Sequence, residues 1–186
     1  MKLGIITGST RQGRQTGHLA DIVTAQAKKL SDTEVKVLDL REYDLPMFDE
    51  AISPKYNPNR QPSEPVKQWL DDLTACDAFV LVSPEYNRAI PGVLKNAFDH
   101  IAHEVNDKPF ALISHGSYSG GFALAALRVI VPELGGISIP HMIGLPYGPF
   151  DQSGVYTGDL AALIDRLDAQ LADLQRYSDT LASVRV

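Results

Sequence analysis

The sequence predicts a three-layer α/β/α fold built around a five-stranded parallel sheet. Short apolar runs of strand length alternate along the chain with amphipathic stretches of helix length. Five strands that are each followed by a helix are typical of a parallel sheet with helices on both faces. The chain has 186 residues, 44% of them hydrophobic, which is enough to bury the core of one such domain. We therefore expect residues 1–186 to form a single domain.

The order of the expected elements follows from these apolar patterns. The strands are expected at residues 3–7, 35–40, 78–82, 110–114 and 137–143. The helices are expected at residues 16–30, 64–76, 91–103, 121–134 and from 159 to about 181. In the last helix, large apolar side chains from Leu160 to Leu174 recur at helical spacing, so we expect this face to pack against the sheet rather than against a partner protein.

The composition excludes several classes of protein. A single cysteine, Cys76, rules out an intrachain disulfide and favours a reducing compartment, for which the cytoplasm is the expected location. The formal net charge of −6 opposes general binding to nucleic acid, which requires a basic surface. The first residues lack the pattern of a signal peptide, and no apolar stretch has the length of a membrane span. We expect neither nucleic acid nor a membrane as a partner.

The first candidate site is the polar segment GSTRQGRQT at residues 8–16, between the first expected strand and helix. Open parallel sheets bind ligands at this position, where the N–H groups and the dipole of a helix N-terminus favour an anion. The hydroxyls of Ser9 and Thr16 and the guanidinium of Arg11 supply further donors that suit a phosphate. A polar turn with solvated arginines is the alternative interpretation.

The charge of the N-terminal region supports an anionic ligand. Residues 1–20 contain Lys2, Arg11 and Arg14 but no acidic residue, in a protein that is acidic overall. This asymmetry predicts a locally positive loop.

Two familiar phosphate-binding loops do not fit this segment. Gly8 and Gly13 have the spacing of a P-loop, but Arg14 and Gln15 stand where that loop needs a lysine and a magnesium-binding Ser or Thr. The glycines at 8, 13 and 17 also do not form the G-x-G-x-x-G fingerprint of dinucleotide-binding folds. Hydrolysis of a nucleoside triphosphate and a stably bound dinucleotide are therefore both disfavoured.

Two more polar segments follow the third and fourth expected strands. They read SPEYN at residues 83–87 and SHGSYSGG at residues 114–121. With a strand order of 2-1-3-4-5, the loops after strands one, three and four open onto one crevice. The ring of Tyr86 and the backbone N–H groups beside it suit a planar ring system with polar edges, although an ordinary proline turn explains residues 83–87 equally well. Because three separated segments converge on one place, we expect one ligand site there.

The motifs GSTR at residues 8–11 and SPEYN at residues 83–87 resemble those of the NAD(P)H-dependent FMN reductases of the flavodoxin-like superfamily, in sequence and in spacing. The resemblance spans nearly the whole chain and implies a flavodoxin-like fold with FMN as cofactor and NAD(P)H as electron donor. It implies electron transfer to a small acceptor such as a quinone, free flavin, an azo compound or chromate. It also implies a homodimer or homotetramer.

The resemblance further implies which residues form the FMN site. The implied phosphate contacts are Ser9, Arg11, Gln15 and Thr16; the implied border of the isoalloxazine ring is Pro84, Glu85, Tyr86 and Asn87; the implied third flavin loop is Ser114, His115, Gly116 and Ser117. Many family members carry serine and asparagine at the positions of Arg14 and Thr16, so this chain departs from the family there.

No catalytic side chain is expected, because flavin N5 is the reacting atom; Tyr86 and Asn87 are expected near the reacting face. The sequence agrees with this expectation, since it contains neither H-E-x-x-H nor G-x-S-x-G. His100 and His103 fit two polar helix positions better than metal ligands, so no metal is expected.

Three questions stay open at this point. A flavodoxin-type electron carrier without its own NAD(P)H oxidation is the main alternative function, and a flavin-free interaction domain with the same fold is another. The proline-rich segment 45–65 has no assigned role, although Met47, Phe48 and Tyr56 give it apolar surface with which to dock. It is a candidate to reach the active site of a neighbouring subunit.

Overall fold

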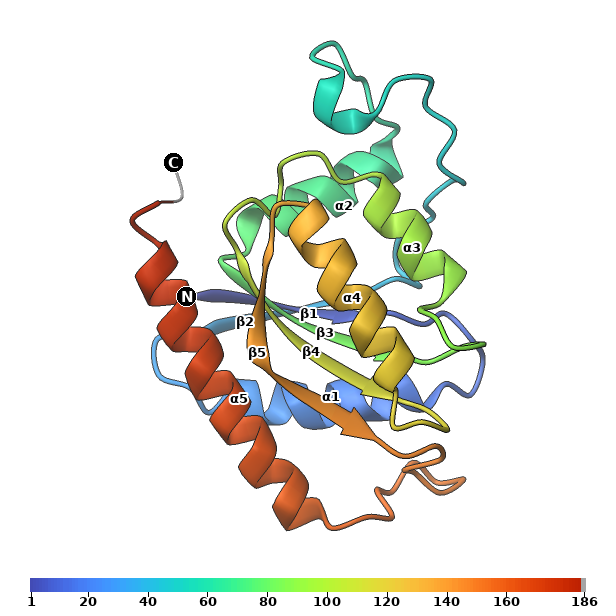
Figure 1. Ribbon diagram of the computed structural model, residues 1–186, viewed down its shortest axis with the longest axis vertical. Coiled ribbons are helices and arrows are strands. Elements are labelled where there is room, and N and C mark those ends of the chain that lie inside the picture. The colour runs from blue at the N-terminus through green and yellow to red at the C-terminus, as the bar shows by residue number, and fades with distance from the viewer. Residues whose placement is uncertain (185–186) are drawn as a thin grey trace.

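The computed structural model describes residues 1–184 and contains a five-stranded parallel sheet with strand order β2-β1-β3-β4-β5. This order confirms the predicted flavodoxin-like arrangement. Helices cover both faces of the sheet (Figure 1). The strands are β1 (Lys2–Thr7), β2 (Glu34–Asp39), β3 (Ala78–Pro84), β4 (Pro109–His115) and β5 (Ile137–Leu145).

The helices alternate with these strands as predicted. They are α1 (Gln15–Ala27), α2 (Glu64–Ala75), α3 (Gly92–Asp99), α4 (Gly121–Glu133) and α5 (Leu160–Leu181), with a short 3₁₀ helix η1 (Pro54–Tyr56) before α2. Among residues 1–184, no helix combines the length and the apolar character that a bilayer span requires.

The expected helix over residues 91–103 is wrong at its C-terminal end, because α3 ends at Asp99. The N–H groups of Ala102 and His103 donate to the Glu104 carboxylate instead of to carbonyls one turn back. The carbonyl of His100 accepts from the Arg60 guanidinium at 2.8 Å. These side chains satisfy the backbone groups that a longer helix would have paired, so the chain turns here.

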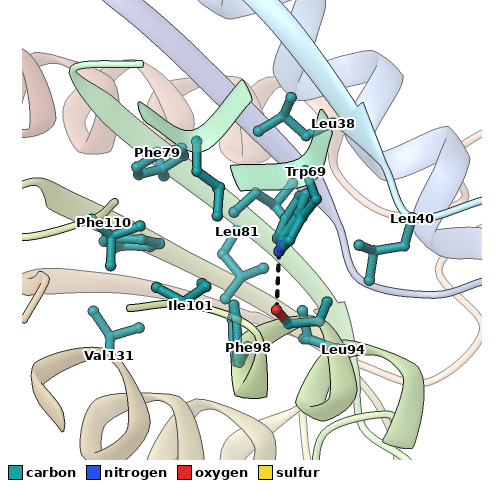
Figure 2. Close-up of a cluster of buried hydrophobic side chains, with 14 of the residues drawn as sticks. Leu38, Leu40, Trp69, Phe79, Leu81, Leu94, Phe98, Ile101, Phe110 and Val131 are labelled. Atoms are coloured by element: carbon teal, nitrogen blue, oxygen red, sulfur yellow. Dashed lines mark hydrogen bonds between the residues drawn. The ribbon is translucent and has the colours of Figure 1, made fainter. Parts of the chain in front are cut away.

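One face of the sheet packs against α2, α3 and α4. The strand β3 is buried along its whole length, and Phe79 stacks on Phe110 with ring centroids 4.7 Å apart. Trp69 of α2 is fully buried, and its indole N–H donates to the carbonyl of Ala97 in α3 at 3.0 Å (Figure 2). Burying such large apolar side chains stabilises the fold by about 2 kcal/mol each.

The other face packs against α1 and α5 (Figure 1). The buried stripe of α5 consists of Leu163, Leu167, Leu171 and Leu174, which confirms that this helix packs on the sheet. Leu160 is the exception, because it lies 45% exposed at the start of the helix.

The segment that joins β2 to α2 is docked on α3. The amide of Asn96 accepts from the N–H of Phe48 at 2.8 Å and donates to the carbonyl of Pro46 at 2.9 Å. His100 also donates to that carbonyl at 3.0 Å and packs edge-on against the Phe48 ring. Met47 and Tyr56 remain more than three-quarters exposed, so only part of the predicted apolar surface docks on this chain.

Candidate functional site

The carboxyl ends of β1, β3 and β4 lie side by side, and the loops that follow them surround one hollow of about 170 Å³. This is the switch point of the sheet, where chain connections leave in opposite directions and open a crevice. The lining residues are Arg11, Gly13, Arg14, Gln15, Thr16, Pro84, Glu85, Tyr86, His115, Gly116 and Tyr147. The structure therefore brings together the three segments that the sequence predicts to converge.

The loop after β1 turns tightly into the N-terminus of α1. The N–H of Gly8 donates to the carbonyl of Val82 at 2.8 Å, and a β-carbon at position 8 would lie 2.9 Å from Leu94. Gly13 adopts φ +63°, a conformation that favours glycine. The N-cap residue is Arg14, whose side chain has no hydrogen-bond acceptor and therefore does not cap the first turn. The first N–H groups of α1 are thus available to an anion in the hollow.

Arg14 does not contribute the free positive charge that the sequence predicts. Its guanidinium is buried, and it donates to the Asp39 carboxylate and to the carbonyl of Ser9. Arg41 binds the same carboxylate at 2.8 Å. Burial alone raises the pKa of Asp39, but the hydrogen bonds from Arg14 and Arg41 outweigh it and hold this pKa well below its ordinary value.

The predicted positive loop therefore reduces to one arginine. Lys2 lies at the opposite end of β1, 4.0 Å from Glu34. Arg11 is exposed and has no carboxylate partner within residues 1–184, and its guanidinium lies 5.4 Å from the centroid of the Tyr86 ring. Arg11 is consequently the cation that this loop presents to the hollow.

Two hydrogen bonds join the loops across the crevice. The hydroxyls of Ser9 and Tyr86 lie 2.8 Å apart, which ties the loop after β1 to the loop after β3. The hydroxyl of Thr16 lies 3.0 Å from Nε2 of His115, which ties α1 to the carboxyl end of β4. Burial lowers the pKa of His115 to about 4, so the imidazole is neutral near pH 7.

The wall that the loop after β4 contributes depends on a close approach of its backbone to the loop after β3. A β-carbon at position 116 would lie 2.7 Å from the β-carbon of Glu85, so only glycine fits there. The N–H of Glu85 donates to the carbonyl of His115 at 2.8 Å. The Glu85 carboxylate accepts from the N–H of Phe122 at 2.9 Å and so anchors the start of α4.

Four predicted cofactor residues do not line the hollow. Ser9 is fully buried behind Tyr86, and Ser114 is fully buried where a β-carbon on Gly120 would overlap its hydroxyl. Asn87 and Ser117 are exposed and are absent from the residues that line the hollow. Side chains alternate between the two faces along a strand, so His115 and its neighbour Ser114 cannot both face the hollow.

Conversely, the sequence prediction missed Tyr147, and it gave Gln15 only as a phosphate contact. Tyr147 is 79% exposed and follows β5, whose carboxyl end lies at the same edge of the sheet. That position is the signal that would have found it. Nε2 of Gln15 donates to the carbonyl of Phe150 at 3.0 Å, which ties the segment after β5 to the first turn of α1.

Comparison with known proteins agrees with this geometry. A family model described as NADPH-dependent FMN reductase matches residues 1–148. An NAD(P)H-dependent FMN reductase of Schizosaccharomyces pombe is 34% identical over 127 residues, which cover 68% of this chain and 64% of that protein. An FMN-dependent NADPH-azoreductase of Staphylococcus haemolyticus is 34% identical over 168 residues, 86% of each chain.

The fold has counterparts among solved structures. FerB, an NAD(P)H:acceptor oxidoreductase from Paracoccus denitrificans, superposes with a TM-score of 0.73 at 23% identity, covering 95% of this chain and 98% of that chain. This likeness establishes the fold, while the family model and the more similar relatives establish the family. The chain belongs to the family of NADPH-dependent FMN reductases.

Proposed function

We propose that this protein is an NAD(P)H-dependent oxidoreductase that holds FMN in the hollow between the loops after β1, β3 and β4. The observation that carries the proposal is the convergence of these loops at the switch point, beside the uncapped N-terminus of α1. FMN is the cofactor and NAD(P)H is the electron donor.

The residues present fit the two ends of FMN. The phosphate suits the first turn of α1, the Thr16 hydroxyl and Arg11, a cation that has no carboxylate partner among the described residues 1–184. The flavin ring suits the wall made by Pro84, Glu85 and Tyr86, where backbone groups and an aromatic side chain face the hollow.

The remaining predicted residues receive different roles in this proposal. His115 and Gly116 form the wall opposite Tyr86, with Gly116 allowing the backbone to approach. Ser9 acts through its hydrogen bond to Tyr86, and Ser114 packs beneath the loop after β4. Asn87 and Ser117 lie at the rim, where they meet substrates rather than the cofactor.

When bound, FMN supplies the redox chemistry, taking a hydride from NAD(P)H and passing electrons to an acceptor. This chain binds and orients the cofactor, and its backbone N–H groups offset negative charge that develops in the site. His115 is neutral near pH 7 and is held by Thr16, so it orients its wall of the site and is not a source of protons.

The acceptor proposed is a small molecule of the class of quinones, free flavins, azo compounds or chromate. Tyr86 is only partly buried and Tyr147 is largely exposed at the mouth of the hollow, which leaves room for different planar acceptors. Among the relatives, one is named an FMN reductase and another an azoreductase, and this range supports the proposal. We further propose that residues 1–186 form one domain and assemble as a homodimer or homotetramer in the cytoplasm.

An absorbance spectrum tests the function directly. The protein is mixed with FMN, desalted, and then treated anaerobically with NADPH and, separately, with NADH. Retained flavin that bleaches within seconds supports the reductase. Retained flavin that stays oxidised would instead support an electron carrier, and a protein that retains no FMN even at high concentration would refute the cofactor site.

A further inference from the structure

A cluster of one cation and two aromatic rings lies on the surface next to the hollow. The guanidinium of Arg88 lies 5.1 Å from the ring centroid of Tyr118 and 5.1 Å from that of Phe122. One Nη of Arg88 also donates to the Tyr118 hydroxyl at 3.3 Å. The two rings meet edge to face, with centroids 5.4 Å apart. The arginine is therefore held in place by its neighbours instead of moving freely in solvent.

The backbone connects this cluster to the walls of the hollow. Tyr86 and Ala89 exchange two backbone hydrogen bonds of 2.9 Å, which places Arg88 at the tip of a tight turn with φ +62°. Glu85, which lines the hollow, accepts from the N–H of Phe122. Tyr118 follows the lining residue Gly116 by two positions. The cluster thus extends the same rim on which the wall of the site is built.

Within residues 1–184, no carboxylate neutralises the charge of Arg88. In the part of the chain that the structure describes, no carboxylate forms an ion pair with Arg88, whereas Arg14 and Arg60 are both paired. The carboxylate nearest in the chain, that of Glu85, is engaged by the N–H of Phe122. Tyr118 and Phe122 remain 58% and 41% exposed, so large aromatic surfaces stay in solvent beside an unpaired cation.

We propose that Arg88, Tyr118 and Phe122 bind the adenosine-phosphate half of the electron donor. A guanidinium held beside aromatic rings keeps N–H groups that the rings and the Tyr118 hydroxyl do not use, and these groups fit a phosphate through two parallel hydrogen bonds. The exposed rings offer a face on which an adenine stacks. This inference rests on the proposed function, and it assigns Arg88 a part in recognising the donor. Both the diphosphate and the 2′-phosphate of the dinucleotide present this chemistry.

The test compares Arg88→Gln with Arg88→Lys and with the control Arg176→Gln. Arg176 is also an exposed arginine over a ring, since it lies 4.8 Å from the centroid of Tyr177, but it belongs to the C-terminal part of α5. That part of α5 is at the edge of the sheet opposite the site, because the helix runs antiparallel to the strands (Figure 1). The rate of anaerobic flavin reduction is measured against the concentration of NADPH and of NADH.

We expect Arg88→Gln to raise the donor concentration for half-maximal reduction roughly tenfold, with Arg88→Lys intermediate and Arg176→Gln unchanged. A loss confined to NADPH assigns Arg88 to the 2′-phosphate, and an equal loss with both donors assigns it to the diphosphate. Unchanged donor dependence, or an effect only on the KM of the acceptor, would overturn the assignment.

A binding measurement separates this inference from the proposed function. Calorimetric titration of the wild-type protein with 2′,5′-ADP and with 5′-ADP needs no redox activity. Weaker binding to Arg88→Gln than to wild type supports the nucleotide site even if the protein proves not to be a reductase. Equal or undetectable binding of both nucleotides to wild type and variant refutes it. Tyr118→Leu provides a second variant, and we expect it to weaken binding while the cation is kept.

Discussion

The hydroxyl of Thr16 and the imidazole of His115 are 99 positions apart in the chain and lie 3.0 Å apart in a buried part of the crevice. This contact joins the first turn of α1 to the carboxyl end of β4, two elements on which the proposed cofactor site depends. Because both side chains are buried, each is the other's polar partner, and a change in one leaves the other without a hydrogen bond.

Replacing Thr16 with valine keeps the shape but removes the hydroxyl. We expect the free energy of unfolding to fall by about 1–3 kcal/mol, because Nε2 of His115 loses its buried partner. Urea unfolding of the apo-protein measures this loss. Thr24→Val is the matched control on the same helix, since the Thr24 hydroxyl donates only to the carbonyl of Ala20. Equal losses in both variants would contradict a special role for the Thr16–His115 contact.

The buried His115 predicts a specific dependence of stability on pH. Its pKa is lowered from 6.5 to about 4 in the folded protein, so below pH 6.5 the unfolded chain takes up a proton that the folded protein does not. The free energy of unfolding should therefore decrease as the pH falls from 6.5 to 4, by up to about 3 kcal/mol. Urea unfolding of wild type and His115→Gln across this range tests the prediction. A slope that persists unchanged in the variant would contradict it.

Arg11 and Arg14 are three positions apart, yet we expect opposite consequences when each becomes glutamine. Arg11→Gln should weaken FMN binding about tenfold or more, because an exposed cation at the proposed phosphate site is lost, while stability changes little. Arg14→Gln should lower the free energy of unfolding by about 3 kcal/mol, because it leaves the buried Asp39 carboxylate with only Arg41. Fluorescence titration with FMN and urea unfolding distinguish the two. If Arg11→Gln binds FMN as tightly as wild type, the phosphate site is assigned wrongly.

Gly116 and Gly92 offer a matched pair of glycine-to-alanine changes. At position 116 a new β-carbon would meet Glu85 at 2.7 Å, so the two loops must separate. We expect Gly116→Ala to lose at least about 1 kcal/mol of stability and to bind FMN more weakly. At position 92, a new β-carbon would have no neighbouring atom within 4 Å, and alanine has a higher helix propensity than glycine. Gly92→Ala should therefore be neutral or slightly stabilising. Thermal unfolding and FMN titration of both variants decide the matter.

The regular elements were predictable because their signals are local. Residues 78–82 of β3 form an uninterrupted apolar run, which indicates a fully buried strand. The apolar stripe of α5 repeats at helical spacing, which indicates both the helix and its buried face. The ends of elements depend on partners elsewhere in the chain. The end of α3 at Asp99 is set partly by Arg60, which lies 40 positions before the carbonyl that it binds.

The candidate site was predictable to the level of segments but not of individual side chains. Parallel strands place their carboxyl ends at one edge, so the segments after β1, β3 and β4 had to meet once the strand order was known. Which side chains face the hollow depends on packing across that edge. Ser114 is covered by the turn at Gly120, while Tyr147 enters from the end of β5.

The charge of the site shows this division most clearly. By itself, the sequence determined the alternation of strands and helices, the polar loops at their ends and the family to which those loops belong. Only the tertiary structure decided that Arg14 is neutralised by Asp39, and that Arg11 and Arg88 have no carboxylate partner in the part of the chain that the structure describes. The physical reason is that a side chain's charge is expressed or cancelled by neighbours within a few ångströms, and those neighbours are distant in the chain.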